Sequence, residues 1–427
     1  MKNLGGVKLR HHKNTKDFAT QVFKTPEYIF IPMAQTMGAP CEPIVKKGDT
    51  VKIGQKIADT KAFMSAPIHS PVSGEVAEIS DYLNTDGRHC PAVKIIPDGL
   101  DEKSPDIKPP VITDRESLIY AVRESGLAGL GGAAFPTHIK FSYDPVKTPV
   151  DTLVINGAEC EPFITSDYRC FLENSSDIIE GILLVQKILG IPFCKICIED
   201  NKPEAIALMK KKIADSNCID VVTMPSLYPQ GAEKVVIYKG TGRIVCEGQL
   251  PVNVGVVVLN VSTVAFIAQY ARTGIPLIKK RLTLDGTAIK RNAGNYLVPV
   301  GTPIKDLLDF GGAENVKTVL YGGPMMGVSV YDTAQPVLKS TNAILAFSED
   351  ITAPVATDCI RCGKCMRTCP LNLMPMQIEK AYKTKDIDGL KDLRLMLCMN
   401  CGCCSYACPA HRPLAEYNQL AKALLKR

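Results

Sequence analysis

Short runs in which apolar and polar residues alternate fill the region from about Ala39 to Pro97. Glycines separate these runs, as in Val51-Lys52-Ile53-Gly54 and Ser70-Pro71-Val72-Ser73-Gly74. An alternation with period two buries one face of a strand, and glycine accepts the backbone angles of tight turns. The pattern predicts an all-β domain over residues 1–100. A proline-rich linker, Lys103–Pro110, separates it from the next domain.

From Thr113 to about Ala271 apolar strands alternate with helical patterns. Strands are expected at residues 152–155 and 195–198, and helices at residues 118–124 and 178–189. Such an order is typical of a mainly parallel sheet covered by helices. The pattern therefore predicts an α/β domain over residues 112–271.

One stretch of this domain, Gly248–Ala271, contains no Asp, Glu, Lys or Arg and is long enough to cross a bilayer. Its amides, including Asn253, Asn260 and Gln269, are unfavourable in hydrocarbon, and its β-branched half gives way to a helical half after Asn260. We expect a buried strand, a short turn and a packed helix instead. The first 25 residues are basic and polar, so no targeting segment is expected there.

Residues 272–350 carry the signals of a small α+β module. Asp285-Gly286 favours a tight hairpin turn, and a strand is expected at residues 296–300. Thr302 is the expected N-cap of a short helix with Pro303 in its first position, and Gly311-Gly312 ends it. The last segment, residues 351–427, is expected to be helical around two cysteine runs. The fold class predicted for the chain is multidomain α/β.

The glycine turns and short strands of the first domain resemble the biotinyl/lipoyl type of barrel-sandwich domain. Such domains present a modified lysine at a hairpin tip, and Lys61 is the candidate here. Lys61 lacks the neighbours of a carrier lysine, so a structural or docking barrel without modification is favoured. The module at residues 272–350 resembles the soluble-ligand-binding (SLBB) β-grasp domain.

Composition narrows the function classes. The chain has 427 residues, 46% of them hydrophobic and 22% charged, which excludes a disordered or low-complexity protein. A formal net charge of +6 is too small and too evenly spread to indicate nucleic-acid binding. Of the 17 cysteines, eight lie in two short runs near the C-terminus, which indicates metal chemistry in a reducing compartment.

The two cysteine runs share one spacing and are both followed by proline. They are Cys359-x2-Cys362-x2-Cys365-x3-Cys369-Pro370 and Cys398-x2-Cys401-x2-Cys404-x3-Cys408-Pro409. This is the spacing of bacterial two-cluster ferredoxins, in which the fourth cysteine of each run binds the other 4Fe-4S cluster. The expected ligands are therefore Cys359, Cys362, Cys365 and Cys408 for cluster one, and Cys398, Cys401, Cys404 and Cys369 for cluster two.

A pair of zinc knuckles is the alternative, but zinc sites use two CxxC pairs and need no proline after a fourth cysteine. Cys403 is out of phase with its run and is expected to bind no iron. Residues 359–427 contain 12 Lys and Arg against 5 Asp and Glu, an excess that compensates the anionic clusters or steers an acidic partner.

A glycine-rich loop, Gly126–Lys140, is the second informative stretch. Backbone amides without side-chain cover can approach a phosphate, and Lys140 can add a point charge. A helix rather than a strand precedes the loop, so it is a poor Rossmann fingerprint.

Three motifs resemble the NADH- and FMN-binding flavoprotein subunit of respiratory complex I. They are Gly129-x-Gly131-Gly132-Ala133-Ala134-Phe135-Pro136-x3-Lys140, Asn156-x2-Glu159-x-Glu161-Pro162 and Tyr228-x2-Gly231-x-Glu233-Lys234. The order of barrel, flavin domain, β-grasp module and two-cluster tail resembles the RnfC subunit of the Rnf ferredoxin:NAD oxidoreductase family over essentially the whole chain. The stretches Tyr228–Lys234 and Tyr321–Gly327 are similar to this subunit in particular.

The resemblance implies noncovalent FMN and a nucleotide site. The residues implied around FMN are Gly129, Gly131, Gly132, Lys140, Asn156, Glu159, Tyr228, Gly231 and Asn260. Those implied to face NAD(H) are Phe135, Glu161 and Glu233. The complex I subunit has an arginine where Leu130 stands, an acidic residue where Ala158 stands and a glutamate where Ala232 stands.

The resemblance implies a peripheral subunit on the cytoplasmic side of the membrane, belonging to an ion-translocating ferredoxin:NAD+ oxidoreductase. FMN would exchange hydride with NAD(H) and single electrons with two 4Fe-4S clusters, with no catalytic side chain required. Integral-membrane and other redox subunits are the expected partners, and ferredoxin acts indirectly. The alternatives are a related cobalamin reductase, whose flavin motif begins near its N-terminus, and a non-catalytic cluster relay or scaffold.

Overall fold

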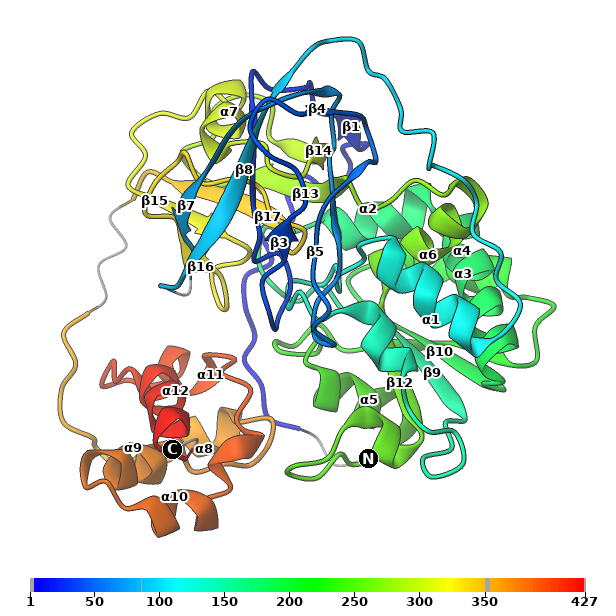
Figure 1. Cartoon of the computed structure of the whole chain (residues 1–427). Coiled ribbons are helices and arrows are strands. Elements are labelled where there is room, and N and C mark those ends of the chain that lie inside the picture. Colours follow the sequence, from blue (N-terminus) through cyan, green and yellow to red (C-terminus); the bar gives the residue numbers. More distant parts are fainter. Residues whose placement is uncertain (1–3, 86, 350–353, 426–427) are drawn as a thin grey trace.

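The computed structural model describes residues 4–85, 87–349 and 354–425. These residues form three sheet-containing regions and a helical cysteine-rich domain (Figure 1). The expected boundary between residues 350 and 351 lies outside the described residues.

The N-terminal all-β domain consists of two small antiparallel sheets packed face to face. One has the order β2 (Ile29–Pro32), β8 (His89–Pro97), β7 (Gly74–Leu83) and β4 (Thr50–Val51). The other has the order β3 (Glu42–Pro43), β5 (Lys56–Asp59) and β6 (Ile68–His69). Ile29, Ile57 and Val93 lie in the core between them with no exposed surface. This confirms the prediction of a barrel-sandwich.

The N-terminal segment, residues 4–22, runs outside the two barrel sheets. Strand β1 (Gln21–Val22) pairs with the sheet that contains β14, and Val7 pairs with Tyr228 of the α/β domain. The segment is too polar to supply a barrel core, and its two buried apolar residues, Val7 and Leu9, pack against Tyr228 and Cys403. Figure 1 shows it running between the cysteine domain and the rest of the chain.

The α/β domain has a four-stranded sheet in which every pair is parallel, as predicted. Its order is β11 (Ile219–Met224), β10 (Phe193–Glu199), β9 (Thr152–Gly157) and β12 (Val256–Asn260). The helices are α1 (Arg115–Glu124), α2 (Ser166–Glu173), α3 (Ser175–Leu189), α4 (Pro203–Lys212), α5 (Glu233–Thr241) and α6 (Val261–Thr273).

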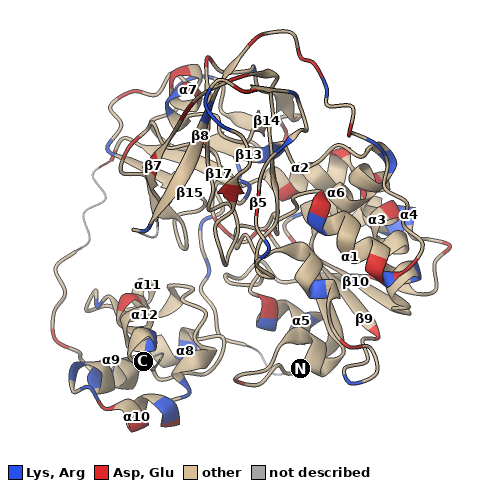
Figure 2. Cartoon of the chain, viewed as in Figure 1, with Lys and Arg blue, Asp and Glu red and all other residues tan. Residues whose placement is uncertain are grey.

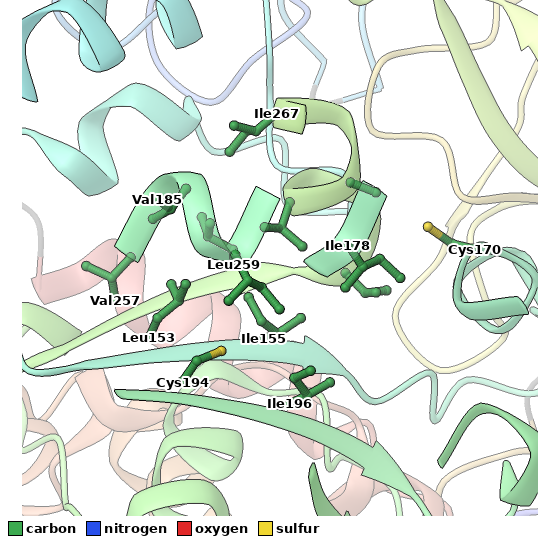
Figure 3. Packing of buried hydrophobic residues seen from close by; sticks show 14 of the residues in the cluster. Leu153, Ile155, Cys170, Ile178, Val185, Cys194, Ile196, Val257, Leu259 and Ile267 are labelled. Atoms are coloured by element: carbon green, nitrogen blue, oxygen red, sulfur yellow. The ribbon is translucent and has the colours of Figure 1, made fainter. Parts of the chain in front are cut away.

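Both faces of this sheet are buried, which explains its continuous apolar runs. On one face Leu153, Ile155 and Leu259 pack against residues of α3 and α6 (Figure 3). On the other face a second cluster contains Val154 and Val258 with apolar residues of α5. Cys194 and Cys197 of β10 belong to different clusters, so they face opposite sides of the sheet and do not form a redox pair.

The uncharged stretch at residues 248–271 forms β12 and most of α6, with Asn260 as N-cap of the helix, as predicted. Its side chain accepts hydrogen bonds from the amides of Ser262 and Thr263. None of the helices in residues 4–85, 87–349 and 354–425 is both long and apolar enough to cross a membrane.

A six-stranded mixed sheet follows, with the order β1, β14 (Gly294–Pro299), β13 (Lys279–Asp285), β17 (Ala343–Phe347), β15 (Thr318–Tyr321) and β16 (Val328–Ser329). The hairpin β13–β14 is antiparallel as expected, but its connection is longer than a two-residue turn. Gly286 has φ +118° and packs against the backbone of Ala346, which carries the chain past the sheet edge. Helix α7 (Ile304–Phe310) has Pro303, not Thr302, as N-cap, because the Thr302 hydroxyl donates to the Pro299 carbonyl instead.

The cysteine-rich domain consists of short helices. They are α8 (Lys364–Thr368), α9 (Pro375–Lys383), α10 (Ile387–Asp392), α11 (Cys403–Tyr406) and α12 (Leu414–Leu425). Ile378, Leu390 and Ala421 form its small core. Figure 2 shows Lys and Arg along α8, α9 and α10.

Candidate redox site

The carboxyl edge of the parallel sheet brings two predicted residues side by side. Asn156 lies near the end of β9, Asn260 ends β12, and the two are register partners. Ligands of open α/β sheets bind at this edge, beyond the carboxyl ends of the strands. The Asn156 amide donates to the Gly231 carbonyl at 2.8 Å, and the Asn260 amide donates to Asp167 at 2.7 Å. Three segments distant in sequence therefore meet at one edge.

The glycine loop lies over this edge and is held at both of its ends. The Gly129 amide donates to the Phe135 carbonyl at 2.8 Å, and Ala128 pairs with Pro136. Gly131 and Gly132 are exposed, and Gly132 has φ +106°. A Cβ at Gly131 would lie 3.2 Å from the Asn260 amide nitrogen. A side chain at Gly131 would therefore press on the Asn260 amide, whereas glycine leaves the backbone of Gly131 and Gly132 open to solvent.

Two buried lysines, which the sequence analysis did not predict as site residues, donate hydrogen bonds to backbone carbonyls of the glycine loop. Lys280 donates to the Leu130 carbonyl at 2.8 Å, and Lys339 donates to the carbonyls of Pro67 and Gly126 at 2.7 and 2.6 Å. Burial lowers the pKa of each lysine to about 8. A signal for Lys280 does exist, because it shares the inward face of β13 with Leu282 and Leu284.

Lys140, Glu233 and Phe135 come together at the rim of the loop. Lys140 follows the loop in the short 3-10 helix η1 (Thr137–Phe141) and donates to Glu233 at 2.6 Å and to the Val258 carbonyl at 3.0 Å. Its ammonium lies 5.9 Å from the centre of the Phe135 ring. The Glu233 side chain is 43% exposed, so this group is accessible.

The side chain of Glu159 points into the protein, where it is bound to the start of helix α2. Its buried carboxylate accepts hydrogen bonds from the amides of Asp167 and Tyr168, at 2.7 and 3.3 Å, and so caps the N-terminus of α2. Burial raises the pKa of this carboxyl. Lys13 fixes the loop between β9 and α2, because its ammonium donates to the carbonyls of Glu159, Glu161 and Ile164. Nothing in the polar N-terminal sequence indicated this contact.

Glu161 and Tyr228 are engaged with other parts of the chain. The Glu161 carboxylate accepts from the amides of Met325 and Met326 at 3.0 and 2.9 Å, in the loop of the Tyr321–Gly327 motif, and burial raises its pKa. The Tyr228 hydroxyl donates to the Cys401 carbonyl at 2.7 Å. These two residues link the α/β domain to its neighbours.

The eight cysteines of the two runs line two separate hollows, four to each. Cys359, Cys362, Cys365 and Cys408 line one, and Cys369, Cys398, Cys401 and Cys404 line the other. The fourth cysteine of each run has thus crossed to the other run. Cys403 also borders the second hollow, and its thiol is oriented to the Tyr228 carbonyl at 3.8 Å.

Four thiols in each hollow have the donor chemistry of a cube-shaped iron-sulfur cluster. Each set consists of four thiols surrounded by apolar side chains, with Met376 and Leu414 at the first and Leu371 and Leu373 at the second. Within the described part of the chain, no three His, Cys, Asp or Glu side chains form a group that could hold one metal ion.

Family models match three parts of the chain. Residues 1–100 match the RnfC barrel sandwich hybrid domain, residues 122–269 the Nuo51 FMN-binding domain, and residues 358–411 a 4Fe-4S dicluster domain. The three matches cover the barrel, the α/β domain and the cysteine domain.

Curated relatives match nearly the whole chain, and each is the subunit lettered C of its complex. The relative from the proton-translocating ferredoxin:NAD(+) oxidoreductase complex of Clostridium ljungdahlii is 41% identical over 391 residues, covering 89% of this chain and 82% of the relative. The relative from the Na(+)-translocating complex of Acetobacterium woodii is 40% identical, with 88% and 86% covered. The relative from the ion-translocating oxidoreductase complex of Rhodobacter capsulatus is 36% identical over 99% of this chain and 82% of its own length.

Among solved structures, an air-oxidised NAD+-reducing [NiFe]-hydrogenase matches this chain with a TM-score of 0.51. The match covers 73% of this chain and 63% of the hydrogenase chain, which is less than two thirds of the latter. At 19% sequence identity this match supports the fold alone.

Proposed function

The chain belongs to the RnfC family, the subunits lettered C of ion-translocating ferredoxin:NAD(+) oxidoreductase complexes, and on this premise we propose that it carries electrons between NAD(H) and two 4Fe-4S clusters by way of FMN. One observation carries the proposal: Tyr228 belongs to a segment that contacts both the sheet edge under the glycine loop and the backbone of Cys401. The segment would thus join the flavin site to one of the two clusters.

The glycine loop and the ends of β9 and β12 would hold FMN without a covalent bond. The backbone of Gly131 and Gly132 is exposed and that of Gly129 half-buried, and amides without side-chain cover suit a phosphate or a flat ring. Asn156, Gly231 and Asn260 line the same edge. Bound FMN would supply the chemistry that joins two-electron exchange with NAD(H) to one-electron exchange with clusters.

The Lys140 ammonium would bind the phosphate of FMN, and its hydrogen bond to Glu233 would be replaced by one to this phosphate. Both side chains are partly exposed, at 25% and 43%, so the exchange needs little rearrangement. Glu233 would then be free to accept from a ribose hydroxyl, and Phe135 would offer a ring face to the nucleotide. The loops around the site would be fixed by Glu159, Glu161 and Tyr228, whose side chains bond to other parts of the protein and would not touch the flavin.

The two sets of cysteines would hold one cluster each. The set with Cys401 lies against the α/β domain through Tyr228, so we assign it the position nearer the flavin. The set with Cys359 and Cys362, both exposed, would exchange electrons with a partner. The positive charge of this domain favours an acidic partner surface (Figure 2).

The remaining modules would dock the protein. We propose that residues 272–350 are a β-grasp module and that the chain attaches peripherally, at the cytoplasmic face of the membrane, to integral-membrane and other redox subunits. The names of its relatives, each a subunit of an ion-translocating complex, support the attachment to other subunits.

A second candidate is a cluster relay without nucleotide chemistry. It draws support from Glu161, whose carboxylate is already satisfied by the amides of Met325 and Met326. A relay would carry electrons through the cysteine sets alone.

The deciding experiment uses the whole chain, purified without oxygen and supplied with FMN. Iron and FMN are quantified, NADH is added, and the flavin and cluster absorbance are followed together. The proposal expects one FMN, two clusters and bleaching of both by NADH. Full iron content with neither flavin binding nor a response to NADH would leave the relay.

A further inference from the structure

Two loops of the barrel border the rim of the proposed nucleotide site. The Met37 amide donates to the Ala134 carbonyl at 2.9 Å. The Phe63 ring meets the ring of His138 edge-on, with the ring centres 6.4 Å apart. The two contacts flank Phe135, at the end of the glycine loop. The barrel therefore supplies a border to a site that the sequence placed wholly in the α/β domain.

The hairpin tip between β5 and β6, residues 60–65, is fixed by polar contacts. Arg123 at the end of α1 donates to Asp59 at 2.6 Å and to the Thr60 carbonyl at 2.7 Å. Lys56 and Glu124 form an ion pair at 2.5 Å beside it. These contacts join the tip to the helix that leads directly into the glycine loop.

The second barrel loop is bonded to the tip. The Ala39 amide donates to the Met64 carbonyl at 2.9 Å, and the Ser65 hydroxyl donates to the Ala39 carbonyl at 3.0 Å. Gly38 lies so close that a Cβ there would be 2.1 Å from the Met64 carbonyl oxygen. The position of Met37 is therefore set by the tip as well.

The side chains that this rim presents are apolar and exposed. Phe63 is 64% exposed and Met37 is 51% exposed, although polar contacts hold the backbone behind them. Neither side chain contributes much to a core at this exposure, and apolar side chains that are exposed next to one another mark binding sites more often than single ones do. Lys61, two residues before Phe63, is exposed too and places a cation at the same tip.

We propose that Phe63 and Met37 form the outer wall of the nucleotide site and receive the adenine ring of NAD(H), with Lys61 near its pyrophosphate. The inference rests on the proposed function. With the nicotinamide ring at a flavin held by Gly129–Gly132, the adenosine half would pass Phe135, which the Met37–Ala134 and Phe63–His138 contacts flank. An aromatic face stacks on a base, a thioether packs against a ring edge, and a lysine attracts phosphate.

In this proposal the hairpin tip binds the adenylate half of NAD(H), and an unmodified Lys61 is sufficient for this role. A flat ring and a cation at neighbouring positions match the two chemical features of an adenine nucleotide. Loss of the ring should weaken nucleotide binding about tenfold, which corresponds to about 1.4 kcal/mol and lies within the range for base stacking on an aromatic side chain.

The test compares two reduced nucleotides on the whole chain loaded with FMN and iron. For Phe63→Ser we expect the KM for NADH to rise about tenfold with kcat unchanged, because the nicotinamide still reaches the flavin. The KM for reduced nicotinamide mononucleotide, which lacks the adenylate half, should not change. Phe63→Trp should restore the KM for NADH. Leu100→Ser, a change at a barrel residue 68% exposed, is the matched control.

Three results would overturn the inference. The KM of Phe63→Ser for NADH could equal that of Leu100→Ser, or both nucleotides could be affected equally. Alternatively, activity could fall only in the assembled membrane complex while the isolated chain keeps its KM, which would make the rim a docking surface for a partner protein. If the wild-type chain binds FMN and iron but does not react with NADH, the proposed function itself fails, and this outcome is distinct from the other three.

Discussion

The hydroxyl of Tyr228 donates a hydrogen bond to the backbone carbonyl of Cys401, 2.7 Å away. Tyr228 is 3% exposed, and its own backbone pairs with Val7 of the N-terminal segment. Three residues further on, the Gly231 carbonyl accepts from Asn156 at the sheet edge. One short segment therefore connects the proposed flavin site to a proposed cluster ligand.

Tyr228→Phe should slow electron transfer between flavin and clusters without emptying either site. The change leaves the ring in place but removes the donor to Cys401, at a cost of about 1 kcal/mol in the docking of the cysteine domain. We expect cluster reduction after NADH addition to slow up to about fivefold in rapid-mixing absorbance experiments. Tyr120→Phe, at an exposed position of α1, is the control. Unchanged cluster kinetics would remove Tyr228 from the path.

Pairs of cysteine substitutions should reveal the crossed grouping. Cys359→Ser with Cys408→Ser changes two ligands of one set, so about half of the iron should remain. Cys359→Ser with Cys369→Ser changes one ligand in each set, although both belong to the same run, so nearly all iron should be lost. Iron quantification and electron paramagnetic resonance measure the outcome. Equal iron in the two double variants would contradict the grouping, and Cys403→Ser should keep both clusters.

The sequence alone was sufficient to predict the parallel strands, the helix cap at Asn260 and the cysteine runs, because each of these features depends on residues close together in the sequence. The parallel strands β9 and β12 are continuous apolar runs, and Asn260 is a residue type that caps helices. The cysteine spacing is likewise local in each run. The grouping of Cys408 with Cys359 could be predicted only because the double-run spacing is specific to one arrangement.

Lys280→Met should weaken FMN binding. Lys280 is the residue that holds the Leu130 carbonyl, at 2.8 Å, and a buried charge-assisted hydrogen bond of this kind contributes about 1.5–3 kcal/mol. We expect about a tenfold rise in the Kd for FMN, measured by flavin fluorescence, with iron content unchanged. Lys279→Met on the same strand is the matched control. If both variants bind FMN equally, the loop does not depend on Lys280.

Lys339 should make stability depend on pH in the alkaline range. Burial lowers its pKa from 10.5 to about 8, so between these values the unfolded chain binds more protons than the folded chain. The free energy of unfolding should therefore rise with pH through this range, by at most about 1.4 kcal/mol per pH unit from this residue. Below pH 8 Lys339 is protonated in both states and contributes no slope.

The measurement is the difference in thermal midpoint between the wild type and Lys339→Met from pH 7.5 to 9.5. We expect the wild type to gain relative to the variant as pH rises, since methionine cannot titrate. Lys317→Met, an exposed change in the same region, should run parallel to the wild type. Parallel curves for Lys339→Met would show that the folded-state pKa is not lowered.

Contacts between distant segments could not be predicted from the sequence. Lys13 and Lys339 each satisfy carbonyls more than a hundred residues away, and lysine in a polar stretch carries no local sign of burial. The barrel rim at Phe63 depends on the Arg123–Asp59 contact, which also joins two domains. The Asp285-Gly286 turn was predicted too tight because its geometry depends on Ala346 across the sheet.

The N-terminal segment also bears on how the protein is assembled. Gly5 lies against the backbone of Cys369, where a Cβ would come within 2.5 Å of the carbonyl oxygen, and Val7 pairs with Tyr228. During translation these residues are made long before Cys369, so they must wait without their partner until the cysteine domain leaves the ribosome. The cysteine domain can therefore join the N-terminal segment only late in synthesis, and a bulky affinity tag fused just before Gly5 would obstruct this contact.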